Sequence, residues 1–143
     1  MAVVTKRVYE PPEATDGTRV LVDRLWPRGL RKDEIALDDW LRDLAPSNDL
    51  RKWFHSQPEQ WLQFRKRYLK ELSRPELESD LQKLYTLARN RKRLTLLYAS
   101  KNDERNNATV LKDLLEGMRK PPSAAGPGVV RAARARQAAI RRR

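Results

Sequence analysis

The sequence predicts an α/β protein: a single domain with a small, mostly parallel sheet of about three strands flanked by helices. Two apolar runs, at residues 20–22 and 94–99, have the length and composition of buried strands. Amphipathic segments separate these runs along the chain, so a helical crossover joins them and favours parallel pairing. A chain of 143 residues is long enough for one domain with its own hydrophobic core.

The N-terminal part is expected to form two strands. The first covers residues 3–9 and is followed by a proline-containing connection over residues 10–16. Asp16 and Gly17 mark the turn into the second strand at residues 18–23.

Helical periodicity begins after Gly29. The spacing predicts one helix, or a pair of short helices, that ends before Pro46. Its expected apolar face consists of Ile35, Leu37, Trp40, Leu41 and Leu44.

Three further helix starts follow. Ser47 is placed to cap a short helix over residues 49–54. Residues 56–59 and 73–76 both have the capping-box pattern Ser-x-x-Glu, with a proline in the first turn. The helix after each box carries an amphipathic stripe, interpreted as core rather than as an aromatic stacking surface. The stripes are Trp61, Phe64, Tyr68 and Leu72, then Leu77, Leu81, Leu84 and Ala88.

The run at residues 94–99 is continuous and apolar, which suits a strand buried on both faces. After the polar residues 100–103 comes a final helix, and the domain is expected to span residues 1–118. The inward residues of this helix are Val110, Leu111, Leu114, Leu115 and Met118.

Residues 119–143 form a basic tail rich in Arg, Ala and Pro, with eight basic residues and no acidic one. Residues 1–118 hold 23 basic and 19 acidic residues, so the tail supplies +8 of the net charge of +12. The tail has few large apolar residues and is expected to be disordered by itself. It is also expected to make weak, non-specific contacts with nucleic acid phosphates.

Residues 23–29 read DRLWPRG and place two arginines in one turn after a strand. The guanidiniums of Arg24 and Arg28 repel each other unless an anion lies beside them. Asp23 is expected to pair with Arg24, and a bound phosphate or carboxylate would then engage Arg28. The alternative is a structural, salt-bridged turn in which Trp26 fills part of the core.

A second polar loop, residues 100–107, follows the last strand. Carboxyl ends of parallel strands face the ligand crevice, so both loops are expected to line one anion-binding cleft beside the last helix's N-terminus. Alternatively, Asn102 or Asp103 only caps that helix. The candidate ligand-binding residues are Asp23, Arg24, Trp26, Arg28, Lys101, Asn102, Asn106 and Asn107.

The sequence lacks the residues that several kinds of functional site require. The chain has no cysteine, and His55, expected to pack or cap at a helix end, is its only histidine. Cysteine sites and histidine-rich metal sites are therefore excluded, and no metal site is expected. No run has membrane-spanning length, and no phosphate loop or nucleophile elbow is present. The catalytic residues, cofactor, ligand and oligomeric state stay unassigned.

The chain also carries a series of motifs that points to a family. They are KRVY at residues 6–9, VLVDRLWPRG at 20–29, APS at 45–47, LRKWFH at 50–55 and LTLLY at 94–98. On these motifs, residues 3–118 resemble the YeaO-like branch of the domain of unknown function 488 family. The resemblance implies an α/β bacterial cytoplasmic protein with no established reaction. Relatives usually have Asn-His where this chain has Asn106-Asn107, so it implies no proton chemistry here.

Three functions are consistent with these features. The preferred one is a protein with a cleft that binds a phosphate- or carboxylate-bearing ligand at the strand ends. The second is a nucleic-acid-associated protein that uses the basic tail. The third is a non-catalytic interaction or regulatory module in which the motif arginines are structural. Catalysis is left open because no residue is an obvious nucleophile.

Overall fold

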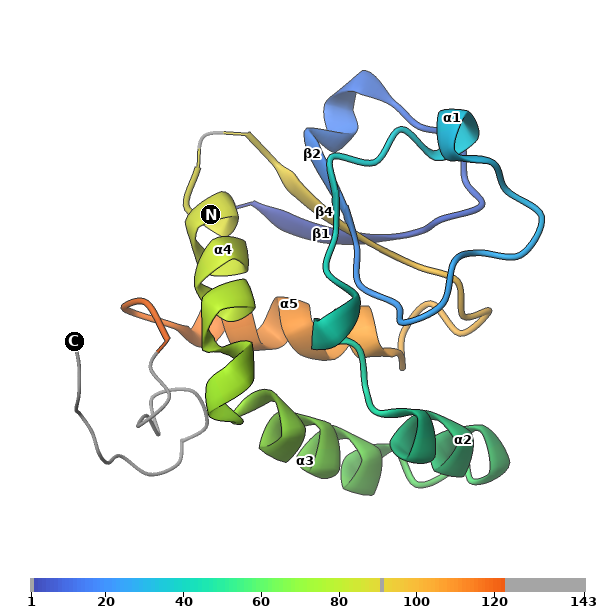
Figure 1. The fold of residues 1–143 in the computed structure, drawn as a ribbon, viewed down its shortest axis with the longest axis vertical. Coiled ribbons are helices and arrows are strands. Elements are labelled where there is room, and N and C mark those ends of the chain that lie inside the picture. The colour runs from blue at the N-terminus through green and yellow to red at the C-terminus, as the bar shows by residue number, and fades with distance from the viewer. Residues whose placement is uncertain (1, 91, 123–143) are drawn as a thin grey trace.

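The computed structural model describes residues 2–90 and 92–122 and contains one four-stranded parallel sheet. Its strands are β1 (Val3–Arg7), β2 (Thr18–Leu21), β3 (Asp39–Trp40) and β4 (Leu94–Tyr98), in the spatial order β1-β4-β2-β3 (Figure 1). The α/β class is confirmed, but the sheet has four strands rather than three.

β4 is the centre of the sheet, and each of its five residues is buried. It pairs in parallel with β1 on one side and β2 on the other, with Leu94 opposite both Val3 and Thr18. The predicted parallel pairing across a helical crossover is therefore confirmed. A largely apolar strand fits this place because helices or loops cover both faces, and its buried Thr95 hydroxyl donates to the Asp16 carbonyl at 2.6 Å.

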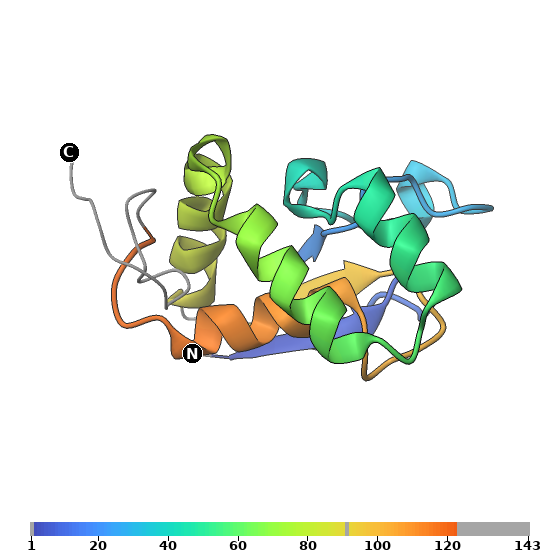
Figure 2. The ribbon, with the colours of Figure 1, turned by 90° about the horizontal axis from the view of Figure 1, so that it is seen from below.

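The four longer helices form two layers on one side of the sheet, and α1 (Lys32–Ile35) lies on the other side (Figures 1 and 2). α5 (Asn107–Gly117) contacts β1 and β4 directly, and α3 (Trp61–Leu72) and α4 (Glu78–Ala88) contact α5. α2 (Asn48–Ser56) packs against α3, so these two form an outer hairpin. The other short elements are η1 (Ala14–Asp16), η2 (Arg42–Leu44) and η3 (Pro75–Leu77).

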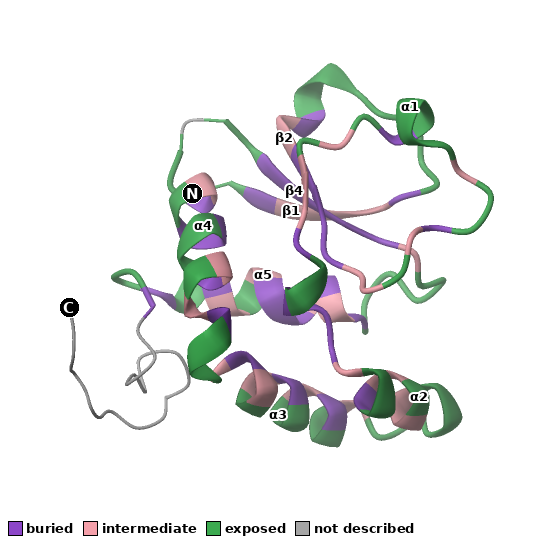
Figure 3. Ribbon diagram, viewed as in Figure 1, coloured by how far each residue is buried: buried purple, intermediate pink, exposed green. Residues whose placement is uncertain are grey.

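Strand alternation divides the interior into two clusters, which Figure 3 shows as purple segments on both sides of the strands. Leu94, Leu96 and Tyr98 face the large cluster under the helices. Leu97 faces a smaller cluster with Leu21, which the loop after β2 and α1 cover. Each strand residue thus contributes to one side only, as the two-residue period of a strand requires.

β3 corrects part of the helix, or pair of short helices, expected between Gly29 and Pro46, because this strand separates α1 from η2. The apolar residues of this segment do not share one face, because Ile35 belongs to the smaller cluster and Leu44 to the large one. Ala36 ends α1 in the left-handed conformation, with φ at 55°. Asp38 then pairs its N–H with the Arg19 carbonyl at 2.8 Å, which begins the pairing alongside β2. Pairing with the free edge of β2 therefore outweighs the helical preference of the local sequence.

The two expected capping boxes are also corrected. α3 begins after Gln60, and η3 begins after Arg74, with no side-chain cap in either case. Ser56 and Ser73 instead donate their hydroxyls backward, to the carbonyls of Trp53 and Lys70. Both serines thus bond a carbonyl at the C-terminus of the preceding helix. A serine between two helices can either cap the second helix or bond the end of the first, so the Ser-x-x-Glu pattern does not distinguish the two roles. Ser47 does cap α2, as predicted, by accepting from the Leu50 N–H at 3.1 Å.

The C-terminal part of the fold extends a few residues beyond α5. Met118 is buried, and the carbonyl of Pro122 accepts a hydrogen bond from Gln82 of α4 at 3.2 Å. The tail expected over residues 119–143 lies outside the described residues from position 123 onward.

A buried ion pair holds the loop-covered side of the sheet together. Arg19 on β2 is 4% exposed and contacts the Asp16 carboxylate at 2.5 Å. The same guanidinium donates to the Ile35 carbonyl at the end of α1, at 2.6 Å. Lys6 on β1 is the second cation on Asp16, at 3.0 Å. One arginine thus connects β2, η1 and α1.

The turn before β2 requires glycine. Gly17 has φ at 68°, in the left-handed region, and a Cβ there would lie 2.2 Å from the Arg93 carbonyl oxygen. That carbonyl accepts from the Thr18 N–H at 2.8 Å. The close approach of the chain before β4 therefore depends on this residue having no side chain.

The Arg19 network generates a stability prediction. Arg19→Met leaves the buried Asp16 with Lys6 as its only cation, so the free energy of unfolding should fall by ~3–5 kcal/mol. Urea denaturation measures this change. Arg31→Ala is the control, because the Arg31–Asp33 pair is exposed and should change stability by under ~1 kcal/mol. Equal effects of the two substitutions would contradict the role given to Arg19.

The same network predicts a pH dependence. Although burial alone would raise the pKa of Asp16, hydrogen bonds from the Glu13 N–H, Lys6 and Arg19 lower it below its usual 3.8. The folded-state pKa lies below the unfolded one, so this carboxylate stabilises the fold above pH 3.8, and that contribution is lost as pH falls through the folded pKa. The stability difference between the wild type and Asp16→Asn should therefore shrink in urea titrations below pH 3.8.

Candidate functional site

Asp23 lies just beyond β2, at the edge of the sheet where the strands end, and its carboxylate is used inside the fold. One oxygen accepts from the Ala99 N–H after β4 at 2.9 Å, and the other accepts from the Asn107 side chain at 3.1 Å. Asn107 also donates to the Val22 carbonyl at 2.9 Å. The Asp23 carbonyl accepts from the indole N–H of Trp40 at 2.7 Å. Asp23 thus joins the ends of β2, β3 and β4 to the start of α5.

Arg24 and Trp26 are also bonded to backbone carbonyls. Arg24 donates to the carbonyls of Ala45 and Pro46, each at 3.2 Å, and the described residues contain no ion pair between Arg24 and Asp23. Trp26 donates to the Leu30 carbonyl at 2.7 Å and packs edge-on against a neighbouring indole. The expected Asp23–Arg24 pair is therefore replaced, because carbonyls before α2 and the N–H after β4 lie closer to the two groups.

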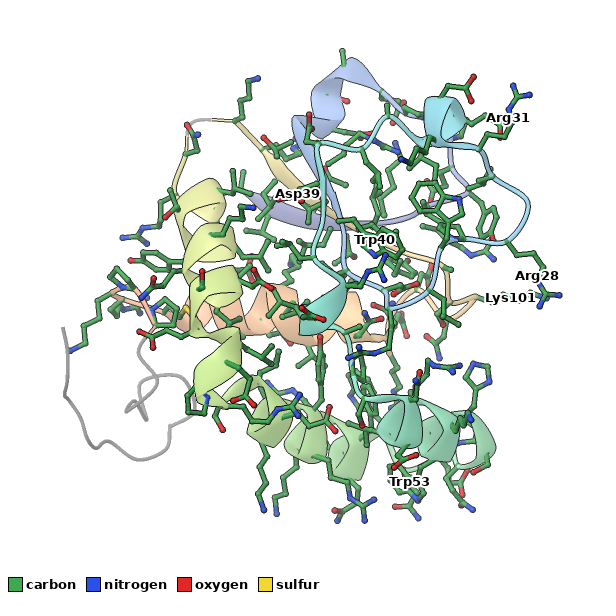
Figure 4. The ribbon with its side chains drawn as sticks, viewed as in Figure 1. Arg28, Arg31, Asp39, Trp40, Trp53 and Lys101 are labelled. Atoms are coloured by element: carbon green, nitrogen blue, oxygen red, sulfur yellow. The ribbon has the colours of Figure 1, made fainter. Side chains whose placement is uncertain are left out.

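The remaining candidate residues are divided between solvent and helix capping. Arg28 and Lys101 are exposed, and Figure 4 shows both reaching outward at the right-hand margin. Asn102 accepts from the Glu104 and Arg105 N–H groups within its own loop. Asn106 is 3% exposed and caps α5 by accepting from the Thr109 N–H at 3.0 Å. The last helix is therefore capped by Asn106, rather than by Asn102 or Asp103.

Burial raises the pKa of Asp23 above its usual value, although the Ala99 N–H, Asn107 and the charge of Arg51 all oppose the shift. Arg51 comes from α2, and its Nε is buried without a hydrogen-bond partner among the described residues. Tyr68 lies in the same region, where burial and the charge of Asp23 raise the pKa of its phenol. A cation of α2 and a phenol of α3 thus lie within electrostatic reach of Asp23.

Two cavities lie against the N-terminus of α2 and share Ser47 and Arg74. The smaller one, about 360 Å³, is lined by Arg24, Asp43, Ser47, Asn48, Arg74, Glu76 and Leu77. The larger one, about 840 Å³, is lined by Ser47, Asp49, Leu50, Trp53, Arg67, Lys70, Glu71, Ser73, Arg74 and Pro75. Arg24 is the one predicted ligand residue that lines either of these cavities.

Sequence reasoning missed Arg74 and Asn48, the residues that meet Arg24 at the smaller cavity. Arg74 was assigned only to a capping box, and Asn48 is the first residue of a helix whose cap was recognised. The usable signal was that cap, because the first turn of any helix leaves N–H groups free for an anion. The concentration of basic residues in α3, at positions 65–67 and 70, is a second signal.

The described residues contain neither a candidate metal site nor a membrane-spanning helix. No group of three or more His, Asp or Glu side chains is arranged there to hold a metal ion. No helix in residues 2–90 and 92–122 is both long and apolar enough to cross a bilayer.

The fold and this region define a small parallel α/β protein whose strand-end polar groups are mostly bonded inside the fold. Comparison with known proteins supplies the family: the model of the inactive DUF488-N3 subclade matches residues 2–126. The chain therefore belongs to that subclade, in the YeaO-like branch of the domain of unknown function 488 family.

Two relatives illustrate the similarity. The chain is 46% identical over 118 residues to Uncharacterized protein YeaO of Escherichia coli K12, covering 82% of this chain and all of YeaO. It is 43% identical over 111 residues to Uncharacterized protein Rv3073c of Mycobacterium tuberculosis H37Rv, covering 78% of this chain and 91% of Rv3073c. No solved structure matches the chain.

The environment of Asp23 generates a further prediction. Its folded pKa lies above 3.8, so its ionisation costs stability, and this cost grows as pH rises from 3.8 through the folded pKa. Asn107→Ala removes a donor to the ionised form. It should raise the pKa of Asp23 further and lower the unfolding free energy at pH 7 by ~1–3 kcal/mol. Carboxyl ¹³C titration and urea denaturation measure the two effects.

Asn102→Ala is the control for Asn107→Ala, since its side chain bonds only its own loop. It should leave the Asp23 titration unchanged. The stability loss in Asn107→Ala should diminish at acidic pH, where Asp23 is neutral in both proteins. An unchanged Asp23 pKa in Asn107→Ala would contradict the described hydrogen bond.

Proposed function

We propose that the protein is a non-catalytic module that binds a small phosphate- or carboxylate-bearing ligand in the 360 Å³ cavity at the N-terminus of α2. The observation that carries the proposal is the meeting of two guanidiniums there. Arg24 comes from the loop after β2 and Arg74 from the segment after α3, about fifty residues apart in sequence. Both line the cavity together with the first turn of α2.

The geometry favours an anion because backbone carbonyls hold part of each guanidinium, whereas its remaining nitrogens are free of hydrogen bonds to the described residues. Arg24 is fixed by two carbonyls, and Arg74 donates its Nε to the Glu71 carbonyl at 3.0 Å. Within the described residues, one terminal nitrogen of Arg24 and both of Arg74 have no hydrogen bond, so they can engage an oxyanion. The nine-residue α2 adds the N–H groups of its first turn and its positive dipole end.

Two carboxylates, Asp43 and Glu76, also line the cavity, and both are exposed. They reduce the local positive potential, so we expect weak binding that weakens further with added salt. Among phosphate- and carboxylate-bearing ligands, we therefore expect a doubly charged phosphate to bind more tightly than a single carboxylate.

The absence of catalysis is proposed on two grounds. Asp23, the carboxylate of the motif, accepts the Ala99 N–H on one oxygen and the Asn107 side chain on the other, so hydrogen bonds inside the fold fix its orientation and compete with a substrate. The family model that matches the chain is described as an inactive subclade. Similarity to bacterial proteins such as YeaO supports a cytoplasmic site of action.

Phosphate tests the proposed site directly. Phosphate should raise the melting temperature of the wild type, with a stabilisation of ~2.7 kcal/mol at a hundred times its dissociation constant. Arg74→Gln should lose most of this response with little change in baseline stability, because Arg74 is exposed. Differential scanning fluorimetry over a phosphate series at constant ionic strength measures both quantities.

Arg28→Gln is the matched control, because Arg28 is an exposed arginine that lines neither cavity. Its response to phosphate should equal that of the wild type. A loss of response in Arg28→Gln with a normal response in Arg74→Gln would refute the cavity. That result would favour a clamp formed by the arginines of the DRLWPRG turn.

A further inference from the structure

The 840 Å³ cavity is a groove between α2 and α3, and we call it the α2–α3 groove, with the ten lining residues given above. Its floor is apolar: Leu50 is 6% exposed, and Trp53 and Pro75 lie beside it. Figure 4 shows Trp53 at the lower margin of the molecule, on α2. A groove with an apolar floor on an outer helical layer can accept a partner without changes in the core.

Three cations, Arg67, Lys70 and Arg74, line this groove and are exposed. Arg67 stacks over the Trp53 ring at 4.3 Å from its centroid. That contact places the guanidinium over part of the apolar floor. Tryptophan and arginine in such positions dominate many protein-binding surfaces, because they combine large apolar area with directed hydrogen bonds.

One of the two carboxylates that line the groove is already bonded inside the fold, whereas the three cations are exposed. Glu71 accepts from the Ser47 N–H at 2.9 Å and from its hydroxyl at 2.6 Å, so its charge is committed to the cap of α2. Asp49 is the other acidic residue of the lining and is exposed. Cations therefore predominate among the lining groups that remain free for a partner.

The charge of the fold is concentrated on this hairpin. Residues 47–74 contain seven basic and three acidic residues, a net charge of +4. Residues 1–118 as a whole also carry +4, so the remainder of the fold is neutral in sum. A positive field of this kind steers negatively charged partners toward the groove.

We infer that the α2–α3 groove binds an acidic linear peptide segment of another protein, with an apolar side chain on the Trp53 floor. Acidic residues of the peptide flank this anchor and pair with Arg67, Lys70 and Arg74. The inference goes beyond the small-anion site and does not require it, because Arg67 and Lys70 line only the groove.

A peptide fits this groove better than a nucleic acid. One face of the Trp53 ring is already covered by Arg67, which reduces the surface available for base stacking. Asp49 and Glu71 would also repel a phosphate backbone, which carries a charge at each nucleotide. A peptide can instead place neutral residues beside these carboxylates.

The test uses the full chain and a short fluorescent peptide with a central Leu-Phe pair flanked by glutamates. Two matched peptides replace the glutamates by glutamines or the Leu-Phe pair by serines. Fluorescence anisotropy should show the acidic apolar peptide binding about tenfold more tightly than either matched peptide. In NMR spectra, the indole N–H signal of Trp53, assigned with Trp53→Phe, should shift when this peptide is added.

Two double variants of equal net charge separate the groove from general attraction. Arg67→Glu with Lys70→Glu reverses two lining cations and should weaken peptide binding about tenfold or more. Lys52→Glu with Lys66→Glu reverses two exposed cations of the same helices outside the lining, and should weaken it less than about threefold. The phosphate response should be normal in both variants, because none of these residues lines the smaller cavity.

Three results would overturn the inference. One is equal weakening by the two double variants, since charge alone would then account for the binding. Another is an unshifted Trp53 indole signal at saturating peptide. The third is single-stranded DNA that competes with the peptide for the groove and shifts this signal at lower concentration. Peptide binding without a phosphate response would leave the groove standing and refute the small-anion site instead.

Discussion

At the strand-end edge of the sheet, the Asp23 carboxylate accepts one hydrogen bond from the Ala99 N–H after β4 and another from Asn107 in α5. The Asp23 carbonyl also accepts from the Trp40 indole of β3, and Asn107 donates to the Val22 carbonyl after β2, so these bonds join three strand ends to the start of α5. Desolvation raises the pKa of this carboxylate, so these bonds offset only part of the cost of its burial. The arrangement of the loops at this edge therefore depends on the hydrogen bonds of Asp23.

This arrangement accounts for three polar side chains of the DRLWPRG turn. Asp23, Arg24 and Trp26 each bond a backbone group, so these three residues have structural contacts. Arg24 performs two tasks, because its carbonyl bonds also hold it at the N-terminus of α2. The anion site that we propose therefore lies beside the helix that follows the sheet edge, rather than between the two strand-end loops.

The outer hairpin of α2 and α3 has a different character from the rest of the molecule. It carries a net charge equal to that of the entire 1–118 region. Its inner face packs into the core through Leu50, Phe64, Tyr68 and Leu72, whereas its exposed residues are under fewer packing constraints and can be used for recognition. Both proposed binding surfaces lie along this hairpin and share Ser47 and Arg74.

The sequence by itself determined the α/β class, the buried β4, the parallel β2–β4 pairing and the cap of α2 at Ser47, because these depend on local apolar runs and caps. It did not determine β3, whose segment has helical spacing but pairs with the free edge of β2. Nor did it determine the partners of Asp23 and Arg24. Which N–H or carbonyl lies nearest to a charged group depends on how distant segments pack, and only the tertiary structure decides that.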